Sequence, residues 1–449
     1  MHQTVRPAKP PASLGPTDWP TPTRAWVTVF VLMAAYALAF VDRQILTLLV
    51  EPVRRDLNIT DTQFSLLSGL AFTLFYTVMG IPFAWVADRS SRRGLIVFSL
   101  MFWSVMTAAC GAAGSFATLF LARIGVGVGE AGLSPAAYSM IADSFPQARR
   151  ARPLGVYAIG SIAGVGMALI IGGAVIQWAI SAPPVVVPLL GELKSWQLAF
   201  LIVSLPGPIL ALALLLIREP KRQEKPLAEG ETGLSLVAFL RRRWKPFTLL
   251  SLGYALISVA IAAYLTWTPT FMARSYGWEM GRIGATYGVI LLVFCTVGVL
   301  LGGWWADHMA TRGVKDAVLR VAIAGSVLAL PFAVAAPFAP DGVTAMAAVT
   351  CLSFGFGLAQ GLPAPTLQAI APNRLRARVM ALYLLIGNIV AFTVGPTGVA
   401  LISDYWLKDS AKIGMAVGII SGVVIPLGCL TLWAARKSFI EASAAEAEL

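Results

Sequence analysis

Four ionisable residues lie inside stretches of sequence that are otherwise apolar. Asp42 and Arg43 occur in the first such stretch, and Arg123 and Glu130 occur in the fourth. A charged side chain at the centre of a membrane helix costs about 2.5–3.5 kcal/mol on insertion scales, so such residues face a cavity or pair with one another. Two acids and two bases in these stretches therefore predict an ion-pair network that can bind or move charge.

The spacing of the four residues places them close enough to form one network. Arg123 and Glu130 are one heptad apart, which puts them on nearly the same helix face, separated by about 10 Å. The first stretch runs in the opposite direction, so helical rise puts Asp42 at a depth close to that of Arg123. Asp42 and Arg43 point about 100° apart around their helix and cannot share one partner.

Two roles for this network follow from the residues. One is a static ion pair that only holds the first helix to the fourth. The other is a proton switch at Glu130 with Asp42 as its partner, because desolvation favours the neutral acid whereas a nearby arginine favours the carboxylate. Four glycines near Glu130 are expected to clear space beside it. They are Gly125, Gly127, Gly129 and Gly132.

The composition indicates that the apolar stretches are membrane spans. Of 449 residues, 57% are hydrophobic and 12% are charged, against about 45–50% and about 25% in soluble domains. A bilayer core about 30 Å thick needs about 20 apolar helical residues, and that length predicts twelve spans. The first six lie near 24–50, 62–86, 94–113, 115–142, 153–179 and 196–217. The second six lie near 248–272, 283–306, 317–336, 343–370, 376–403 and 412–435.

The two sets of six spans carry features that recur in the same order. The pairs are Trp85-Val86-Ala87-Asp88 with Trp304-Trp305-Ala306-Asp307, Arg150-Ala151-Arg152 with Arg376-Ala377-Arg378, and the small residues Gly160, Gly164, Ala168 and Gly172 with Gly387, Ala391 and Gly395. Small residues every four positions let helices approach closely in lipid. The repeats predict an all-α membrane protein of two pseudo-symmetric six-helix bundles.

The duplication divides the chain into five regions. They are a Pro-rich tail at 1–23, an N-terminal bundle at 24–217, a polar linker at 218–247, a C-terminal bundle at 248–436 and a tail at 437–449. Within the linker, the segment from Leu234 to Phe247 mixes apolar residues, Trp244 and a basic run. This pattern is typical of a helix lying at the headgroup surface. An unstructured basic loop is the alternative.

The distribution of basic residues predicts the orientation. With both termini on one side, 25 Lys and Arg residues fall on that side and 7 on the other. Lys and Arg in short loops are retained in the cytoplasm, so we expect both termini there. The first 23 residues contain no apolar segment of the kind found in cleavable signal peptides. The short linker favours a multi-pass protein of a bacterial inner membrane.

Several classes of function are excluded by what the sequence lacks. Two histidines, His2 and His308, are too few for a His-based metal site, and the four cysteines lie in apolar segments without CxxC pairing. Cysteines in such positions usually act as small, buried hydrophobic residues. The chain contains neither a GxxxxGK[ST] phosphate loop nor HExxH. Its basic residues lie mostly in short loops between spans, which argues against nucleic-acid binding. No cofactor is expected, and protons are the coupling ion that the buried acids suggest.

Two segments resemble a known family. The segment from Ala84 to Arg93 resembles the loop 2–3 signature of the major facilitator superfamily, with Ala84 where that signature usually has Gly. The segment from Ala122 to Ala131, together with Val41-Asp42-Arg43, is similar to the Spinster branch of lipid transporters. The superfamily resemblance extends over nearly the whole chain. It implies that spans 1, 4, 7 and 10 line a central cavity between the two bundles.

The resemblance implies a secondary active transporter that works by alternating access, and the Spinster branch implies a lysophospholipid or sphingolipid-like substrate. Under that hypothesis Asp42 and Glu130 exchange protons, while Arg43 and Arg123 alternate between these acids and an anionic headgroup. The second half offers scattered polar and aromatic side chains, which suits an amphipathic molecule better than a sugar. Candidates for its cavity wall, each of which also has a packing role as an alternative, are Tyr254, Tyr264, Trp267, Gln360 and Asn388.

The repeated loop is expected to form a cytoplasmic gate, because a carboxylate there can accept hydrogen bonds from a neighbouring helix N-terminus. Its residues, which could instead only set topology, are Asp88, Arg89, Arg92, Arg93, Asp307 and Arg312. Two further functions stay open: a proton-coupled efflux carrier of drugs or organic anions, and a lipid scramblase without coupling. An enzyme is disfavoured, since the spans contain no Ser-His-Asp combination. The expected partners are the substrate and membrane lipids, and we expect a monomer.

Overall fold

The structure is a computed structural model that describes residues 19–146, 149–181, 185–187, 191–223, 236–372 and 375–447. These residues include twelve helical spans long and apolar enough to cross a membrane, which confirms the predicted number. Spans 1 to 6 are α1 (Pro22–Leu48), α3 with α4 (Asp61–Ser68, Leu70–Arg89), α5 (Arg92–Gly111), α6 with α7 (Phe116–Glu130, Leu133–Ala142), α8 (Ala151–Ser181) and α9 with α10 (Ser195–Ser204, Pro206–Leu216).

The second half repeats this plan with more interruptions. Spans 7 to 12 are α11 (Leu236–Tyr276), α12, η2 and α13 (Met280–Ile290, Leu291–Cys295, Thr296–Thr311), α14 with η3 (Ala317–Ala335, Ala336–Phe338), α15 with α16 (Gly342–Gln360, Pro363–Ala369), α17, η4, α18 and η5 (Arg376–Ile389, Val390–Val394, Gly395–Leu401, Ile402–Leu407), and α19 (Ile413–Ala447). The short elements between spans are α2 (Val50–Leu57), the antiparallel strands β1 (Val185–Val187) and β2 (Gly191–Leu193), and η6 (Ser410–Lys412).

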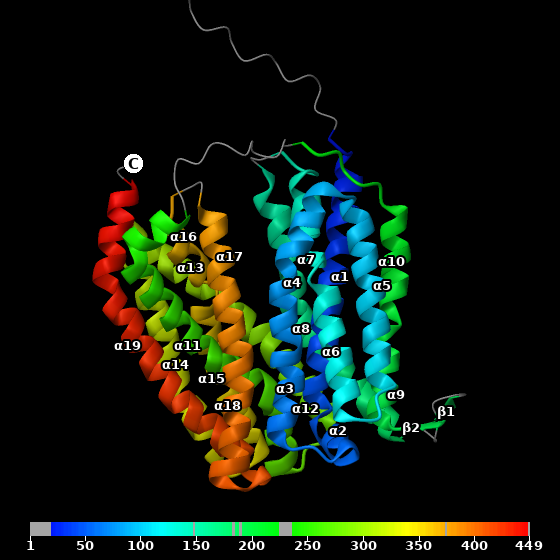
Figure 1. The fold of residues 1–449 in the computed structure, drawn as a ribbon. Coiled ribbons are helices and arrows are strands. Elements are labelled where there is room, and N and C mark those ends of the chain that lie inside the picture. The colour runs from blue at the N-terminus through cyan, green and yellow to red at the C-terminus, as the bar shows by residue number, and fades with distance from the viewer. Residues whose placement is uncertain are drawn as a thin grey trace, which may run out of the picture.

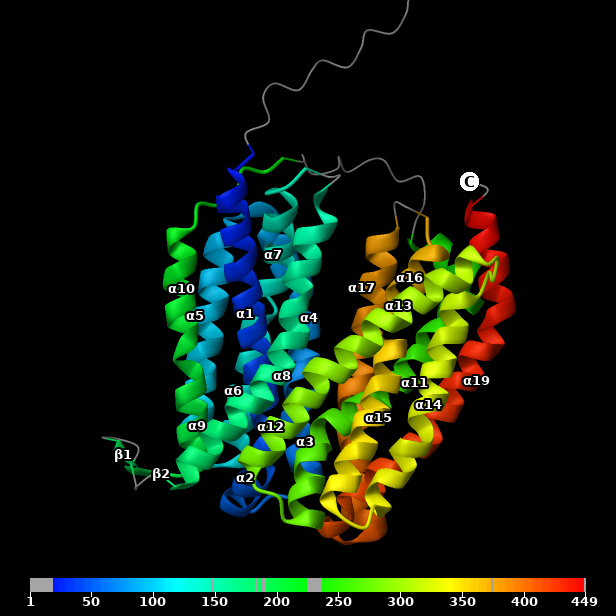
Figure 2. The same cartoon turned by 180° about the vertical axis from the view of Figure 1, so that it is seen from behind.

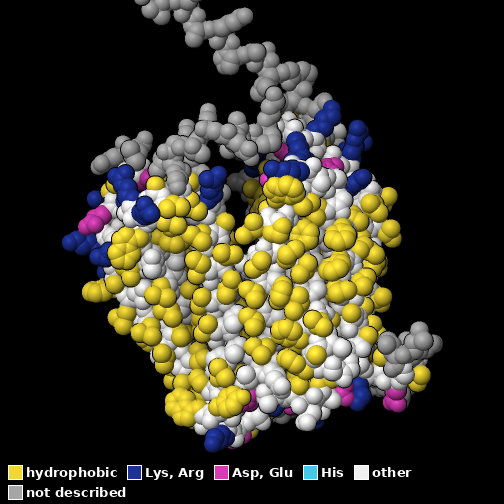
Figure 3. All heavy atoms as spheres, in the orientation of Figure 1, with side chains coloured by type: hydrophobic (Ala, Val, Ile, Leu, Met, Phe, Trp, Pro, Cys, Tyr) yellow, Lys and Arg dark blue, Asp and Glu magenta, His cyan; other side chains and the backbone are white. Residues whose placement is uncertain are grey.

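Spans 1–6 and spans 7–12 form two separate bundles (Figures 1 and 2). The described ends of the chain lie on one side of the molecule, which we call the terminus side, and the bundles meet on the opposite, distal side. There α3 contacts α18, and α8 contacts α12. Figure 3 shows hydrophobic side chains over the lateral face, charged residues near its two ends, and a hollow between the bundles toward the terminus side. The predicted pair of pseudo-symmetric six-helix bundles is confirmed.

Polar caps begin several spans on the distal side. The Thr60 and Ser115 hydroxyls each accept a hydrogen bond from the backbone N–H three residues on, and each belongs to a capping box. Asp341 caps α15 by accepting from the N–H groups of Val343 and Thr344, and these bonds lower the pKa of its carboxyl group. Such caps satisfy donors that the first helical turn leaves unpaired, so they fix where each span starts.

The glycine stripes join helices within each bundle. A Cβ on Gly160 would lie 2.8 Å from the carbonyl oxygen of Met33 on α1. In the second half, a Cβ on Gly395 would lie 2.6 Å from the carbonyl oxygen of Val259 on α11. The fifth span is thus packed backbone to backbone on the first, and the eleventh on the seventh, as expected for repeated units.

A second set of glycines joins the two bundles to each other. A Cβ on Gly284 of α12 would lie 2.2 Å from the Leu169 carbonyl oxygen of α8, and one on Gly288 would lie 2.6 Å from that of Gly166. The four-residue spacing seen in the sequence describes the α1 face of α8 and does not include Gly166. The seam between bundles therefore depends on a second face of the same helix.

The predicted surface helix of the linker corresponds to the first part of α11. This helix begins at Leu236 and is kinked at Arg243, whose φ of −115° and ψ of 21° are not helical. Phe239, before the kink, is buried in one apolar cluster with Phe439 of α19, whereas Trp244 is exposed. The described part of this segment is therefore helical, and its position at the headgroup surface stays a prediction. Residues 1–18, 224–235, 448–449 and Arg374 of the predicted regions lie outside the described residues.

We expect Gly164→Ala to lower the thermal stability of the protein. The added Cβ would lie 2.8 Å from the Ala37 carbonyl oxygen and 2.9 Å from Phe40 Cβ, and overpacking costs about 1–3 kcal/mol. Gly155→Ala in the same helix meets nothing within 4 Å and should be neutral or stabilising by about 0.4–1 kcal/mol. Thermal unfolding of both variants in one detergent tests this. Equal melting temperatures would contradict close packing of α8 on α1.

Candidate functional site

The N-terminal bundle contains an ion pair between Arg43 of α1 and Glu130, the last residue of α6. Arg43 Nε lies 2.7 Å from Glu130 Oε2. The Glu130 side chain is fully buried, whereas the Arg43 side chain is 20% exposed. Desolvating two charges is costly unless good geometry and further contacts compensate. The pair therefore presents one partly accessible cation that is held by a buried carboxylate.

Three aromatic rings surround the Arg43 guanidinium. Its Cζ lies 4.9 Å from the ring centroid of Phe40, 4.6 Å from that of Phe72 and 4.4 Å from that of Tyr76. Each such cation–π contact contributes about 0.5–1 kcal/mol at exposed sites and about 2 kcal/mol when desolvated. Phe72 and Tyr76 also stack on each other along α4. The rings hold the guanidinium between α1 and α4 and give it apolar surroundings.

Asp42 and Arg123 lie next to this pair. Both residues are 1% exposed, and Arg123 Nη1 donates a hydrogen bond to the backbone carbonyl of Asp42 at 3.2 Å. Among the described residues, Arg123 Nε and Glu130 Oε1 are buried without a hydrogen-bond partner. Leaving such atoms unpaired costs about 1–3 kcal/mol each. The structure thus brings the four predicted residues together with bonding capacity that is not used in this conformation.

The glycines around Glu130 have a different role from the expected one. A Cβ on Gly127 would lie 2.6 Å from the Phe72 carbonyl oxygen, and one on Gly129 would lie 2.8 Å from Trp103 Cβ. The prediction that these glycines clear space beside the carboxylate is therefore wrong. They let α4 and α5 pack directly against α6, which is how the helix bearing the charges is held in place.

The regular helical hydrogen bonding of the span that carries Arg123 and Glu130 is interrupted at the site. α6 ends at Glu130, and α7 begins at Leu133. The tenth span has the same interruption, because α15 ends at Gln360 and α16 begins at Pro363. The exposed Gln360 accepts a hydrogen bond from Cys295 Sγ at 3.3 Å. An acid in the first half and an amide in the second thus end equivalent helix segments.

The other proposed wall residues differ in their exposure. Tyr254, Tyr264 and Trp267 are at most 3% exposed, and Asn388 is half-buried. The buried three bond within their own bundle: Tyr254 Oη with Thr366 Oγ1 at 2.8 Å, Tyr264 Oη to the Ala333 carbonyl at 2.5 Å, and Trp267 Nε1 to the Pro396 carbonyl at 3.0 Å. In this conformation the three side chains are therefore held by the C-terminal bundle, and the Trp267 ring also contacts Phe64 of α3, with ring centroids 6.2 Å apart.

Two of the expected gate residues bind the start of the linker. Arg92 pairs with Asp143 of its own bundle and, at 3.0 Å, with Glu219, which follows α10. Arg93 donates to the Ile217 carbonyl at 3.1 Å. Although partial burial raises the pKa of Glu219, hydrogen bonds from Ser91, Arg92 and Arg93 lower it overall. The linker is thus anchored to the N-terminal bundle.

The remaining gate residues do not meet across the bundles here. The Asp88 carbonyl accepts a hydrogen bond from Arg222, and Arg89 lies over the Trp85 ring at 4.2 Å. Asp307 and Arg312 are exposed on the other bundle. Because the bundles are apart on this side, the structure does not show a closed gate. The gate stays a prediction.

Asp316 is a structural acid that sequence reasoning missed. It is 1% exposed, pairs with Arg320 at 2.8 Å, and also pairs with Arg436 of α19. Desolvation raises the pKa of Asp316, but the two arginines lower it overall. Its position four residues before Arg320 was a visible signal, whereas the partner on α19 was not.

Residues 32–396 match the family model described as Major Facilitator Superfamily. The chain belongs to this superfamily. It is therefore a transporter by family and fold, which argues against an enzyme, and it would bind a small-molecule substrate. The match covers most of both bundles and includes all four charged residues of the site.

Individual proteins resemble the chain over most of its length. A protein of Mycolicibacterium smegmatis named MFS-type efflux pump is 31% identical over 94% of this chain and 95% of its own. The D-galactonate transporter of Escherichia coli is 25% identical over 83% and 87%. A bacterial homologue of the human lysosomal transporter Spinster, solved in an inward-facing and unoccupied conformation, matches with a TM-score of 0.76 and 26% identity over 96% and 98%. The resemblance to the Spinster branch is thereby confirmed.

The two bundles of this major facilitator protein are joined on the distal side by ion pairs, which we call the distal ion cluster (Arg274, Glu51, Asp61 and Arg54). Arg274 of α11 bonds to both oxygens of Asp61 at 2.8 Å and to Glu51 at 2.6 Å. Arg54 Nε lies 3.1 Å from Asp61 Oδ1, and the Asp61 side chain is fully buried. Bidentate arginine–carboxylate pairs are among the stronger protein hydrogen bonds.

A second hydrogen-bonded contact between the bundles supports the same closure. The N–H and hydroxyl of Thr62 donate to Asp404 Oδ2 at 2.8 and 2.7 Å. In the sequence, Arg54 and Arg274 lie far apart, and nothing there pairs loops from different bundles. These contacts are therefore a feature that sequence reasoning missed.

We expect Arg274→Gln to destabilise this conformation relative to one that is open on the distal side. Each hydrogen bond to a charged group contributes about 1.5–3 kcal/mol, so losing the cluster should shift the equilibrium by tenfold or more. Electron–electron distance measurements between spin labels at positions 55 and 406, both exposed on the distal side, should gain a longer component. Lys412→Gln, which removes only a local pair with Asp409, is the control. Unchanged distances in Arg274→Gln would contradict a closing role.

Proposed function

We propose that the protein is a secondary active transporter that moves an amphipathic, lipid-like anion by alternating access, with protons as coupling ion. The observation that carries this proposal is the Arg43–Glu130 pair, in which a cation that is 20% exposed is held by a fully buried carboxylate. An incoming anionic headgroup would compete with Glu130 for that cation. Lysophospholipids and sphingolipid-like molecules have this chemistry.

Competition for one guanidinium provides the coupling. When a phosphate or carboxylate of the substrate binds Arg43, Glu130 loses the charge that stabilises its ionised form. A buried carboxylate without that partner is favoured as the protonated acid. Substrate binding is thus linked to proton binding, and by reciprocity the proton changes substrate affinity by the same factor. Asp42 and Arg123 lie next to this pair and would take part in the same exchange of ion-pair partners.

The surroundings of Arg43 favour an amphipathic molecule. Phe40, Phe72 and Tyr76 enclose the guanidinium with ring faces. A sugar would need many polar partners for its hydroxyls, whereas a hydrocarbon tail gains from contact with apolar side chains. Gln360 and Asn388 are the two wall candidates of the second half whose side chains are not fully buried here.

We place the protein in the cell inner membrane with both termini in the cytoplasm. The excess of Lys and Arg on the terminus side supports this orientation. The conformation with the bundles joined on the distal side is then the inward-open state. In the outward-open state, Asp88, Asp307 and the neighbouring arginines of the repeated loops would come together as the cytoplasmic gate.

Two other functions compete with this one. The name of the Mycolicibacterium smegmatis relative favours a proton-coupled efflux carrier of drugs or organic anions, for which Arg43 would bind the anion in the same way. A scramblase without coupling would move lipid only down its gradient. Proteoliposome flux of a lysophospholipid with and without an imposed pH gradient distinguishes them. Accumulation against the lipid gradient excludes the scramblase, and no lipid flux with anion flux retained supports the carrier.

We expect Glu130→Gln to remove the pH dependence of transport while leaving substrate binding detectable. Glutamine mimics the protonated acid, so the site can no longer exchange a proton with the gradient. Asp42→Asn should remove the dependence in part. Uptake into proteoliposomes over a series of internal and external pH values measures this, with the exposed Glu279→Gln as the control. A full pH response in Glu130→Gln would leave only the static role for the network.

We expect Arg43→Lys to fold normally but to transport anionic lipids at least tenfold more slowly. An ammonium is a compact point charge and cannot match the planar fork of a guanidinium toward carboxylate or phosphate. Losing one hydrogen bond to a charged group corresponds to about 1.5–3 kcal/mol. Initial rates of lysophospholipid uptake compare Arg43→Lys with Arg378→Lys, an exposed arginine on the terminus side. Equal rates would contradict headgroup binding at Arg43.

A further inference from the structure

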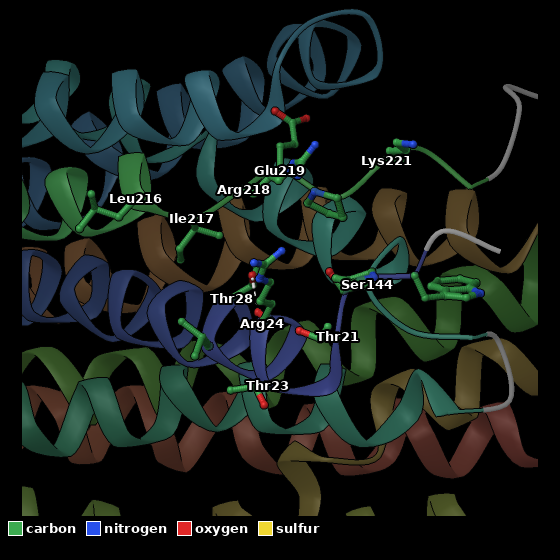
Figure 4. A pocket seen from close by; sticks show the side chains of 14 residues that line it. Thr21, Thr23, Arg24, Thr28, Ser144, Leu216, Ile217, Arg218, Glu219 and Lys221 are labelled. Carbon is green, nitrogen blue, oxygen red and sulfur yellow. Dashed lines mark hydrogen bonds between the residues drawn. The ribbon is translucent and has the colours of Figure 1, made fainter. Parts of the chain in front are cut away.

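A pocket lies at the terminus side of the N-terminal bundle, away from the Arg43 site. It has a volume of about 630 Å³ and lies between the start of α1, the end of α10 and the segment that follows α10 (Figure 4). This volume is within the range of small-ligand pockets, about 300–1,000 Å³. Its lining includes Trp19, Arg24, Val27, Leu216, Arg218 and Lys221.

The charge of this pocket is positive. Arg24, Arg218 and Lys221 line it, and Figure 4 shows the Arg24 side chain projecting from α1 toward the segment after α10. Glu219 is the one acid among the described residues of the lining. Its oxygens accept hydrogen bonds from Ser91 at 2.6 Å and from Arg92 at 3.0 Å. That carboxylate is therefore already paired with the start of α5, which leaves Arg24 and Arg218 as the cations on which a ligand site would depend.

The pocket continues into an apolar surface that faces the membrane. Val27 and Leu216 line the pocket and are 47% and 89% exposed. Three residues from Val27 along α1, Phe30 is 51% exposed, and four residues before Leu216 along α10, Leu212 is 64% exposed. Residues three and four apart share a helix face. Cations at the headgroup level above exposed hydrophobes match a phospholipid, whereas a free anion in water has no use for the apolar part.

We propose that this pocket binds the headgroup phosphate of an anionic phospholipid from the leaflet on the terminus side, with the acyl chains along the exposed faces of α1 and α10. Basic pockets beside membrane helices are known to bind anionic lipid headgroups. The site joins α1, which carries Asp42 and Arg43, to the linker segment that Arg92 anchors. It would hold a resident lipid and is distinct from the substrate site.

The test uses the full-length protein in nanodiscs that contain phosphatidylglycerol and phosphatidylcholine at equal amounts. Native mass spectrometry after release measures which lipid the protein retains. The wild type should retain phosphatidylglycerol preferentially, and Arg24→Gln/Arg218→Gln should lose about 25-fold in that preference, roughly fivefold per cation. The matched control is Arg241→Gln/Arg242→Gln, which removes two exposed basic residues from the same side. Each single variant, Arg24→Gln and Arg218→Gln, should show a partial loss if the double variant does not fold.

Two further measurements test whether the retained lipid is bound at this pocket. Arg43→Gln should keep the preference, since it alters only the substrate site, and its loss would assign the retained lipid to that site instead. Inorganic phosphate should not displace the lipid, and displacement would indicate a site for free phosphate. Equal retention by wild type and double variant, or an equal loss in the control, would overturn the proposal.

Discussion

The structure depends on keeping Arg43 and Glu130 charged inside a membrane-spanning bundle. Neither charge is tolerable there alone, because a buried unpaired ion costs several kcal/mol. The aromatic rings on α1 and α4, the close packing of α4 and α5 on the glycines of α6, and the interruption directly after Glu130 all serve this pair. They fix the positions of the helices while leaving buried polar atoms unpaired beside the charges. Because the helices are closely packed and some polar atoms of the charged residues have no partner, Arg43 and Glu130 could change partners without unfolding of the bundle.

The duplicated halves share a helix plan but differ in chemistry. Both the fourth and the tenth span are interrupted, after Glu130 and after Gln360. In the second half the hydroxyl groups of Tyr254 and Tyr264 and the indole of Trp267 bond to their own bundle and are buried. Among the described residues, the buried acidic and basic side chains within the spans belong to the N-terminal bundle, and the charge exchange that we propose would take place there.

Sequence reasoning succeeded where membrane depth decides the outcome. Counting apolar length gave the twelve spans, and helical rise brought Asp42 to the level of Arg123, which now donates to its carbonyl. It failed where contacts between residues distant in the sequence determine the structure. Arg274 and Asp61 lie in different bundles, more than 200 positions apart, and no periodicity relates them. The glycines near Glu130 were misinterpreted for a similar reason, since a missing side chain permits either open space or a close neighbour, and only the neighbouring helix distinguishes the two.

The distal ion cluster determines how much free energy is needed to open the bundles on the distal side. Reversing a two-state equilibrium from 1:99 to 99:1 needs about 5.5 kcal/mol of differential binding. Hydrogen bonds to charged groups contribute about 1.5–3 kcal/mol each, so the bonds that Arg274 makes to Glu51 and Asp61 are together of that size. A transporter can alternate only if closure on the terminus side returns a similar amount. The repeated loops carry acids and arginines that could do so. In the transport cycle that we propose, protonation and headgroup binding at the Arg43 site would then need to shift a nearly balanced equilibrium by only a few kcal/mol, which a single change of ion-pair partner can provide.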